Sequence, residues 1–325
     1  MRKLVSIALL SAVMLLPLSG MADSWSYQLI FRPTDIPLPA SAPRSAVVTQ
    51  VYSPYVVRPN GMYYMFFGVA VQCQSGAVVR DSIAVAVSAD GVTGWQFLKY
   101  VIEPDPTVCF NPIQKWTDGA LLQTNDPAVI FQNGQFLVFY TAAFYNFAIN
   151  NGIGHIGLAV FDANLNLLSR NDHYLDPPPS FNTPGLPGVA RPAIEQYGRN
   201  SFSLWYDVGG NVFQTWINSL INLNLQPQAN MNVAGAVDVD ITDLGSTQIL
   251  MSSGGSSGIL FKYRLAAPGK SWTPQTDWSP YYGMSPLSGQ GWDADGQGSP
   301  DFFVDPTTCA AKLYMSGVVM NSAKT

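Results

Sequence analysis

Hydrophobic and polar positions alternate in short runs along most of the chain, and Gly, Asn, Asp and Pro separate the runs. Alternation over a few residues predicts β-strands, and the separating residues predict the turns between them. The 3.6-residue period of an amphipathic helix is almost absent after residue 22. The sequence therefore predicts an all-β protein.

One module recurs along the chain: a polar residue that usually precedes Pro, a short apolar strand, a turn, and a second strand rich in aromatic residues. Its five copies begin at Ser53, Asp126, Arg191, Asp238 and Ser299. A further strand-like segment follows each of the first four copies and predicts the two outer strands of a four-stranded sheet. Four strands per repeat at this spacing are typical of a β-propeller. We predict a single five-bladed propeller domain over residues 23–325, with an irregular β-sandwich as the alternative.

The fifth copy has no outer strands of its own, whereas Trp25–Pro33 is a strand-like run without a partner near the start of the chain. We expect this run to close the ring as the outermost strand of the last blade. Closure would remove the open sheet edges through which β proteins aggregate.

The repeat also predicts which residues surround the centre of the propeller. Each innermost strand of a propeller begins near the central axis on one face, here called the top face. The first residues of the five copies should therefore form a polar ring there, beneath long loops. Such a ring under loops is a usual ligand site. The short turns "RPNG", "FQNG" and "ADGVTG" are expected on the opposite, bottom face.

The three cysteines fit this arrangement. Cys73 and Cys109 fall in two loops of the top face, whereas Cys309 falls in a bottom turn. If the protein is exported to an oxidising compartment, Cys73 and Cys109 are expected to form a disulfide and Cys309 to stay free. Three reduced, buried thiols are the alternative.

The first 22 residues have the pattern of a secretory signal peptide. Arg2 and Lys3 precede the apolar run Leu4–Leu18, and small residues follow at the cleavage positions. The run is too short for a membrane span, and no later stretch is long and apolar enough. We therefore expect a secreted or periplasmic protein, active as a monomer.

Composition narrows the class of partner. Apolar residues make up 47% of the chain and charged residues 11%, against about 25% charged residues in a typical domain. The surface must then be mostly uncharged and polar, as is common in exported proteins. A net charge of −5 gives no electrostatic reason to bind nucleic acid or anionic lipid.

Two stretches carry a resemblance to a known group of enzymes. "SPYVVRPNGMYYMFFG…SIAVAVSADGVTGW" and "NDPAVIFQNGQFLVFYT…HIGLAVFD" resemble blades of the five-bladed propeller glycosidases, which include glycoside hydrolase families 43, 32, 62 and 68. The resemblance covers the mature chain but is specific only in the first two blades. It implies a protein that acts on an oligo- or polysaccharide.

Family 43 enzymes place an Asp base in the first blade, an orienting Asp in the second and a Glu acid in the third. Asp126 of "NDPAVI" matches the second of these. Ser53 occupies the position of the base, and Arg191 the stretch where the acid is expected. Neither can do that chemistry, because a hydroxyl is too weak a base and a guanidinium stays charged. The two Glu residues, Glu103 and Glu195, are expected at the rim and towards the bottom.

Other carboxylates could complete a catalytic pair with Asp126, since glycoside hydrolysis needs two. They are Asp118 in a top loop, Asp238 and Asp301 near the starts of blades four and five, and Asp81 at the start of a third strand. Each also has a plain interpretation as a loop or turn acid.

Further residues are expected to bind substrate or an ion. The expected sugar-binding residues are Ser53, Arg191, Trp116, His155, Trp292 and Ser299. "WDADGQGSPD" spaces Asp293, Asp295 and Asp301 as oxygen ligands around a Gly-containing turn, which is a weak Ca²⁺ pattern because the closing Glu is missing. We expect no required cofactor, with Ca²⁺ as the one candidate.

Two functions follow. In the first, the protein is an exported glycoside hydrolase or transglycosidase with Asp126 as one carboxylate. In the second, it is a propeller that binds a glycan or another ligand without catalysis, because Ser53 and Arg191 replace the usual acids.

Overall fold

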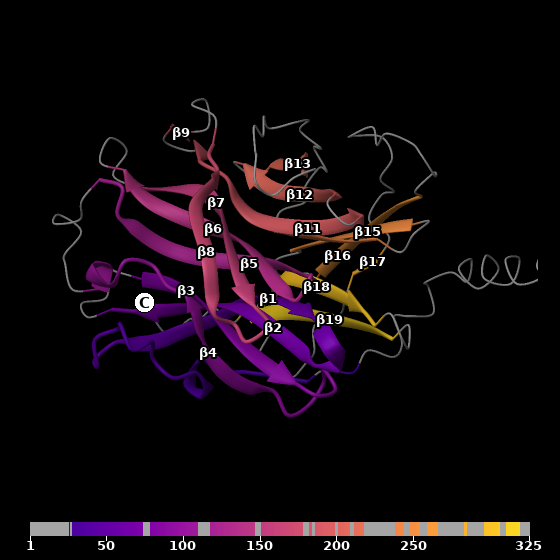
Figure 1. The fold of residues 1–325 in the computed structure, drawn as a ribbon, viewed down its shortest axis with the longest axis horizontal. Coiled ribbons are helices and arrows are strands. Elements are labelled where there is room, and N and C mark those ends of the chain that lie inside the picture. The colour runs from indigo at the N-terminus through magenta and orange to yellow at the C-terminus, as the bar shows by residue number, and fades with distance from the viewer. Residues whose placement is uncertain are drawn as a thin grey trace, which may run out of the picture.

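The computed structural model describes residues 26, 28–73, 79–109, 118–146, 151–177, 182–183, 186–198, 201–208, 211–217, 238–243, 247–253, 259–265, 283–284, 296–305 and 310–318. These residues form antiparallel sheets that follow one another in chain order (Figure 1). The predicted signal peptide lies outside them, as do Trp116, Trp292, Asp293, Asp295 and Cys309.

The strands form five blades along the chain, of which blades I and II are joined into one eight-stranded sheet where β3 pairs with β5. Blade I contains β1 (Val47–Val57), β2 (Tyr63–Gln72), β3 (Val79–Ser88) and β4 (Gln96–Ile102). Blade II contains β5 (Leu121–Gln132), β6 (Gln135–Asn146), β7 (Asn151–Asp162) and β8 (Leu167–Leu175). Blade III contains β11 (Ala190–Gly198), β12 (Ser201–Val208) and β13 (Asn211–Ile217). Blade IV contains β14 (Val239–Asp243), β15 (Thr247–Ser253), β16 (Ile259–Leu265) and β17 (Gly283–Met284). Blade V contains β18 (Gly296–Val304) and β19 (Ala311–Val318).

Short elements connect the blades. The pair β9 (Asn182–Thr183) and β10 (Leu186–Pro187) lies between blades II and III along the chain, and the 3₁₀ turns are η2 (Pro33–Asp35), η3 (Pro59–Gly61) and η4 (Pro106–Cys109). The five-fold repeat is confirmed, with one difference. The outermost strand of blade IV is β17, which follows the strand-like segment "GILFKYRLAAPGKSW" expected to contain it.

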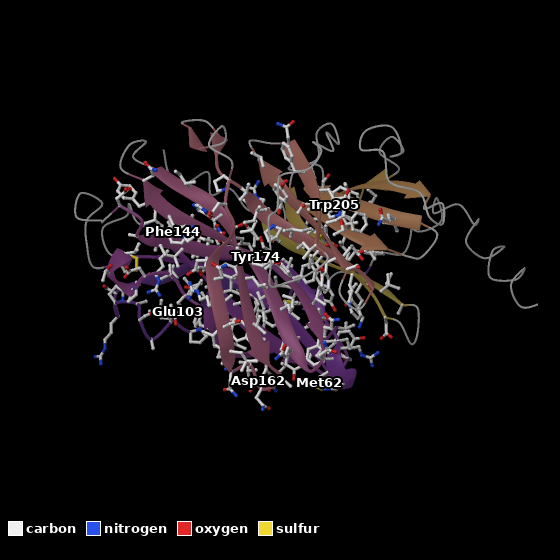
Figure 2. All side chains as sticks on the ribbon, turned by 45° about the horizontal axis from the view of Figure 1, so that its top comes forward. Met62, Glu103, Phe144, Asp162, Tyr174 and Trp205 are labelled. Carbon is white, nitrogen blue, oxygen red and sulfur yellow. A yellow bond between two sulfur atoms is a disulfide. The ribbon has the colours of Figure 1, made fainter. Side chains whose placement is uncertain are left out.

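Asn-Gly turns set the hairpins of blades I and II. Asn60 and Gly61 have φ values of 52° and 84°, and Asn133 and Gly134 have values of 52° and 76°. Two consecutive residues with positive φ match the twist of the flanking strands, and Asn and Gly tolerate this conformation best. Met62 follows the Asn-Gly turn of blade I, and Asp162 begins the turn between β7 and β8. Figure 2 shows both residues along one edge of the molecule and Phe144 well away from that edge.

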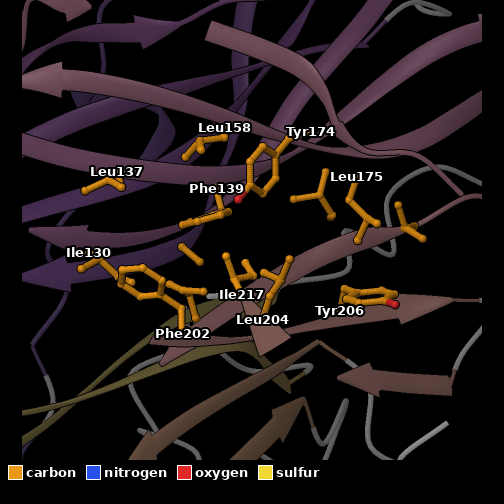
Figure 3. Packing of buried hydrophobic residues seen from close by; sticks show 14 of the residues in the cluster. Ile130, Leu137, Phe139, Leu158, Tyr174, Leu175, Phe202, Leu204, Tyr206 and Ile217 are labelled. Atoms are coloured by element: carbon orange, nitrogen blue, oxygen red, sulfur yellow. The ribbon is translucent and has the colours of Figure 1, made fainter. Parts of the chain in front are cut away.

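Hydrophobic clusters fill the spaces between neighbouring blades. Figure 3 shows the cluster between blades II and III, where Phe139 and Leu158 face Phe202 and Leu204. Equivalent clusters lie between blades I and II, III and IV, and V and I. Blades I, II and III are therefore apolar on both faces, as the aromatic-rich repeat predicts.

Blades V and I meet directly. The Tyr314 hydroxyl donates to the Gly91 carbonyl oxygen at 2.7 Å, and Arg58 forms an ion pair with the buried Asp305 at 2.7 Å. The strand predicted to close the ring is not shown, because residues 28–32 form no strand. Instead Phe31 stacks on Phe67 of blade I, with the ring centroids 5.5 Å apart.

The expected disulfide is confirmed: Cys73 and Cys109 are bonded, with their Cα atoms 5.2 Å apart. A disulfide is consistent with an extracytoplasmic protein. Among the residues that the structure describes, no helix has the length and apolar character needed to cross a membrane.

Candidate active site

The five residues predicted to surround the axis share an unusual backbone conformation. Their φ values are positive: 47° for Ser53, 48° for Asp126, 53° for Arg191, 54° for Asp238 and 47° for Ser299. Residues other than Gly seldom adopt this conformation, although Asp tolerates it better than most. In blades I, II, III and V the strand register shifts at this point, which marks a β-bulge. The bulge bends the innermost strand of each of these four blades at the ring.

The ring residues line one pocket. It encloses about 290 Å³ of empty space including its open mouth, and its walls are the five ring residues, the residues after them, and Tyr55, Ala193 and Asp240. The structure thus brings together Ser53, Asp126, Arg191, Asp238 and Ser299 as the sequence predicted.

Two hydroxyl groups hold the carboxylate of Asp126. Ser53 Oγ donates to Oδ1 at 2.6 Å, and Thr141 Oγ1 lies 3.3 Å from Oδ2. Burial raises the pKa of Asp126, and the nearby carboxylate of Asp238 raises it further. Arg191 and the two hydroxyl groups oppose this rise. Ser53 therefore does not replace the missing base but positions Asp126.

Asp207 at the end of β12 is a further carboxylate of the site. Its Oδ2 accepts from the Arg191 guanidinium at 3.2 Å and from the Asp238 backbone N–H at 2.9 Å. Burial raises the pKa of Asp207 to about 6, although both of these donors act to lower it. A carboxyl group with this pKa can hold a proton in mildly acidic solution and release it near neutrality.

Arg191 lies among three carboxylates. Burial alone would lower the pKa of Arg191, but Asp238, Asp126 and Asp207 together raise it. The side chain is 47% exposed, so part of the guanidinium also faces solvent. Arg191 thus offsets the repulsion between the acids and can donate hydrogen bonds to a ligand.

The sequence analysis missed Asp207, although the repeat contained the signal. Because β12 runs antiparallel to β11, the last residue of the module "AIEQYGRNSFSLWYD" returns to the top face. The same position holds Thr141 in blade II and Ser316 in blade V. The side chains of Thr141, Asp207 and Ser316 each accept the backbone N–H of the next blade's ring residue. The pairs are Arg191 N to Thr141 Oγ1 at 2.8 Å, Asp238 N to Asp207 Oδ2 at 2.9 Å, and Ser53 N to Ser316 Oγ at 2.9 Å.

Asp81 lies buried in β3 beside Asp126, as its predicted place at the top of a third strand suggested. Burial raises its pKa to about 7, a hydrogen bond from Tyr52 opposes this, and the charge of Asp126 adds to it. The Tyr52 ring lies against Gly68, where a Cβ atom would come within 2.9 Å of the ring. Glycine at this position therefore leaves room for the Tyr52 that holds Asp81.

Asp238 and Ser299 form the other side of the ring. Ser299 Oγ donates to Asp238 Oδ2 at 2.7 Å. This contact repeats the arrangement of Ser53 and Asp126, because in both pairs a Ser of one blade binds an Asp of a neighbouring ring position. The candidate site thus has two Ser–Asp pairs, with Arg191 between the two acids along the chain.

Asp301 lies two residues beyond the ring and is 4% exposed. Its Oδ2 accepts the Val56 backbone N–H at 2.9 Å, which ties blade V to blade I. Asp240 does the same between blades IV and V, where it accepts the Phe302 N–H at 2.9 Å. We therefore interpret Asp301 as a structural acid rather than one that faces a substrate. The partners proposed for it in a Ca²⁺ site, Asp293 and Asp295, lie outside the described residues.

The remaining candidates lie away from the pocket. Asp118 is exposed in the turn before β5, and it is not among the lining residues. Glu103 forms an ion pair at 2.7 Å with the buried Arg80. His155 pairs with Asp176 instead of reaching the ring, at 2.7 Å from Nδ1 to Oδ1.

The sequence matches no protein-family model, and no curated protein is detectably related to it. Solved structures are similar over most of the chain. A β-1,2-mannobiose phosphorylase from Listeria innocua has a TM-score of 0.58 and 11% identity, over 88% of this chain and 90% of that one. A glycosyl hydrolase from Bacteroides ovatus has a TM-score of 0.52 and 14% identity, over 82% and 81%. The catalytic domain of a GH62 α-L-arabinofuranosidase from Coprinopsis cinerea has a TM-score of 0.52 and 13% identity, over 89% and 91%.

These matches confirm the resemblance to five-bladed propeller glycosidases and add a phosphorylase to it. At identities of 11–14% they establish the fold, and the chemistry must be argued from the ring of side chains. The chain is structurally similar to the five-bladed propeller glycoside hydrolases and phosphorylases.

Proposed function

We propose that the protein is exported and cleaves or transfers glycosidic bonds of an oligo- or polysaccharide in the pocket of the top face. One observation carries the proposal: Arg191 lies next to Asp126, with which it lines the axial pocket, and its guanidinium also donates at 3.2 Å to the buried Asp207 of blade III. A binding site for a neutral sugar has no need of several carboxylates with raised pKa values. Glycoside hydrolysis does need two carboxyl groups whose pKa values differ.

Each acid has a role in this proposal. Asp207 donates a proton to the leaving oxygen, because a pKa of about 6 keeps a share of the group protonated at mildly acidic pH. Asp126, held by Ser53 and Thr141, activates water or attacks the sugar carbon. Arg191, Asp238 and Ser299 bind sugar hydroxyls. We expect turnover to require neither a cofactor nor Ca²⁺.

A substrate screen tests the proposal. The purified protein is incubated with aryl glycosides and with plant and bacterial polysaccharides, with and without inorganic phosphate. The phosphate arm separates hydrolysis from phosphorolysis, because one similar structure is a mannobiose phosphorylase. We expect release of a sugar or sugar phosphate from at least one substrate.

The matched variants are Asp126→Asn and Asp118→Asn. Asp126→Asn is expected to reduce kcat/KM by about 100-fold or more, as loss of a catalytic acid or base does. Asp118→Asn changes a carboxylate outside the pocket and should leave kcat/KM unchanged. Activity that Asp126→Asn leaves unaltered would remove Asp126 from the mechanism.

The alternative is a propeller that binds a glycan without cleaving it. The observation that favours it is Ser53, which stands where the base of family 43 enzymes is expected and donates its hydroxyl proton to Asp126. In that case calorimetry would show saturable binding of an oligosaccharide, Arg191→Ala would weaken it, and no product would form on long incubation.

A further inference from the structure

The only two histidines of the chain lie side by side on blade II. His155 is in β7 and His173 in β8, and their ring centroids are 4.5 Å apart. Asp176 follows β8, and its Oδ1 lies 2.7 Å from His155 Nδ1 and 2.9 Å from His173 Nδ1. One ligand atom from each of the three residues lies within 4.8 Å of the others.

Packing fixes both imidazole rings. Phe144 of β6 stacks on His173, with centroids 4.4 Å apart and planes at 19°, and its edge meets His155 at 5.2 Å. The His155 side chain is only 13% exposed, whereas His173 and Asp176 are 52% and 60% exposed. Figure 2 shows Phe144 towards one side of the molecule, well apart from Trp205 of blade III. The cluster therefore has a rigid inner side and a solvent-facing outer side.

We propose that His155, His173 and Asp176 form a binding site for a divalent transition-metal ion, Zn²⁺ being the best match. Two imidazole nitrogens and one carboxylate oxygen are ligands that Zn²⁺ prefers, whereas Ca²⁺ and Mg²⁺ prefer oxygen ligands alone. Zn²⁺ bonds to such ligands are about 2.0–2.2 Å long, so the ligand atoms of a tetrahedral site are about 3.3–3.5 Å apart. The two contacts of Asp176 Oδ1, at 2.7 and 2.9 Å, would have to lengthen by about 0.5 Å to reach this separation.

The open side of the cluster leaves the fourth position of the ion for water or for another ligand. The site is distinct from the carboxylate ring, because none of its three residues lines the axial pocket. The proposal therefore does not depend on the proposed glycosidase activity. It needs only that metal binds and that these side chains hold it.

Metal titrations test the proposal. Tag-free protein in a Cys309→Ser background, which removes binding by a thiolate, is titrated by calorimetry with ZnCl₂, CoCl₂ and CaCl₂. We expect saturable one-to-one binding of Zn²⁺ and Co²⁺, a visible absorption band of Co²⁺ typical of a tetrahedral site, and no binding of Ca²⁺ to these residues.

The variants His173→Gln and Asp176→Asn change exposed side chains and should fold normally, which circular dichroism checks. Each is expected to weaken Zn²⁺ binding by about 100-fold, since even residues behind the ligands contribute 10- to 100-fold. Asp35→Asn alters an exposed carboxylate elsewhere and should not change the affinity. Absence of saturable Zn²⁺ binding, or equal affinity in the three variants, would overturn the proposal.

Discussion

Two groups of buried carboxylates lie at the centre of this propeller, and they differ in what surrounds them. Asp126 and Asp207 both interact with the cation of Arg191, and Asp126 and Arg191 belong to the ring that lines the pocket. Asp240 and Asp301 lie one step further along their strands and each accept a backbone N–H of the next blade. Burial raises the pKa of all four.

The comparison shows that a raised pKa alone does not identify a catalytic acid. In the pair of Asp240 and Asp301, here called the lower pair, burial and the charge of Asp240 raise the pKa of Asp301, and Asp301 holds two blades together. For Asp126, two hydroxyl groups and a guanidinium partly oppose the effect of burial, and for Asp207 the same guanidinium and a backbone N–H do so. The neighbouring guanidinium of Arg191 therefore separates the two groups more clearly than the size of the pKa shift.

The largest expected difference concerns catalysis by Asp207. If Asp207 is the general acid, Asp207→Asn should reduce kcat by about 100- to 10,000-fold on substrates with a poor leaving group. The loss should be much smaller on a dinitrophenyl glycoside, which needs no proton on departure. Asp118→Asn, at an exposed carboxylate outside the pocket, is the control and should leave both rates within a few-fold of the wild type. Equal losses on both substrates would remove the acid role from Asp207.

For the free energy of unfolding, we expect the larger loss at Asp301 and the smaller loss at Asp126. Asp301→Ala leaves the buried Val56 N–H without its acceptor, which is expected to cost about 1–3 kcal/mol in urea unfolding. Asp301→Asn keeps an oxygen there and should lose much less. Asp126→Ala changes a half-buried side chain that opens to the pocket and should cost less than Asp301→Ala. The reverse order would show that the ring, not the lower pair, holds the blades together.

The smallest effect is on the pH dependence of stability. A buried Asp with a raised folded-state pKa keeps its proton on folding, so its contribution is complete below the unfolded pKa of about 3.9 and is lost as pH rises through the folded value. For Asp81 that window extends to about pH 7. Unfolding free energies measured from pH 4 to 8 should therefore fall with pH.

Asp81→Asn should make this slope less steep. The reduction should correspond to at most about one proton released on unfolding between pH 4 and 7. Asp105→Asn, at a partly exposed carboxylate remote from the ring, is the control and should keep the slope. A slope unchanged by Asp81→Asn would mean that Asp81 is already ionised in the folded protein over this range.

The fold and the ring could be predicted because each blade repeats the same local signals. A polar residue, followed by Pro in four of the five copies, marks the axial position, and Asn-Gly marks the hairpin in blades I and II, so the five ring residues could be located by position alone. The cysteine pair followed from the same map of top and bottom loops. These features are determined by residues close together in the sequence, and the repeat pattern therefore indicates them.

The remaining residues depend on contacts between strands and between blades, which the first residue of each repeat copy does not indicate. Asp207 ends a strand of one blade and binds Arg191 and the next blade's backbone. Asp301 looked like a substrate-facing acid beside Ser299, but the bulge directs it to Val56. His155 and His173 are 18 positions apart, and only the pairing of β7 with β8 brings them together.

The shared backbone conformation of the five ring residues has a consequence for how such proteins change over time. Because each position presents its side chain from the same left-handed backbone conformation, a substitution there alters chemistry without rebuilding a blade. Ser53→Asp would even suit the left-handed backbone better than the present Ser, since Asp tolerates positive φ more readily. Activity on this scaffold can therefore be gained or lost at single positions while the architecture is inherited intact.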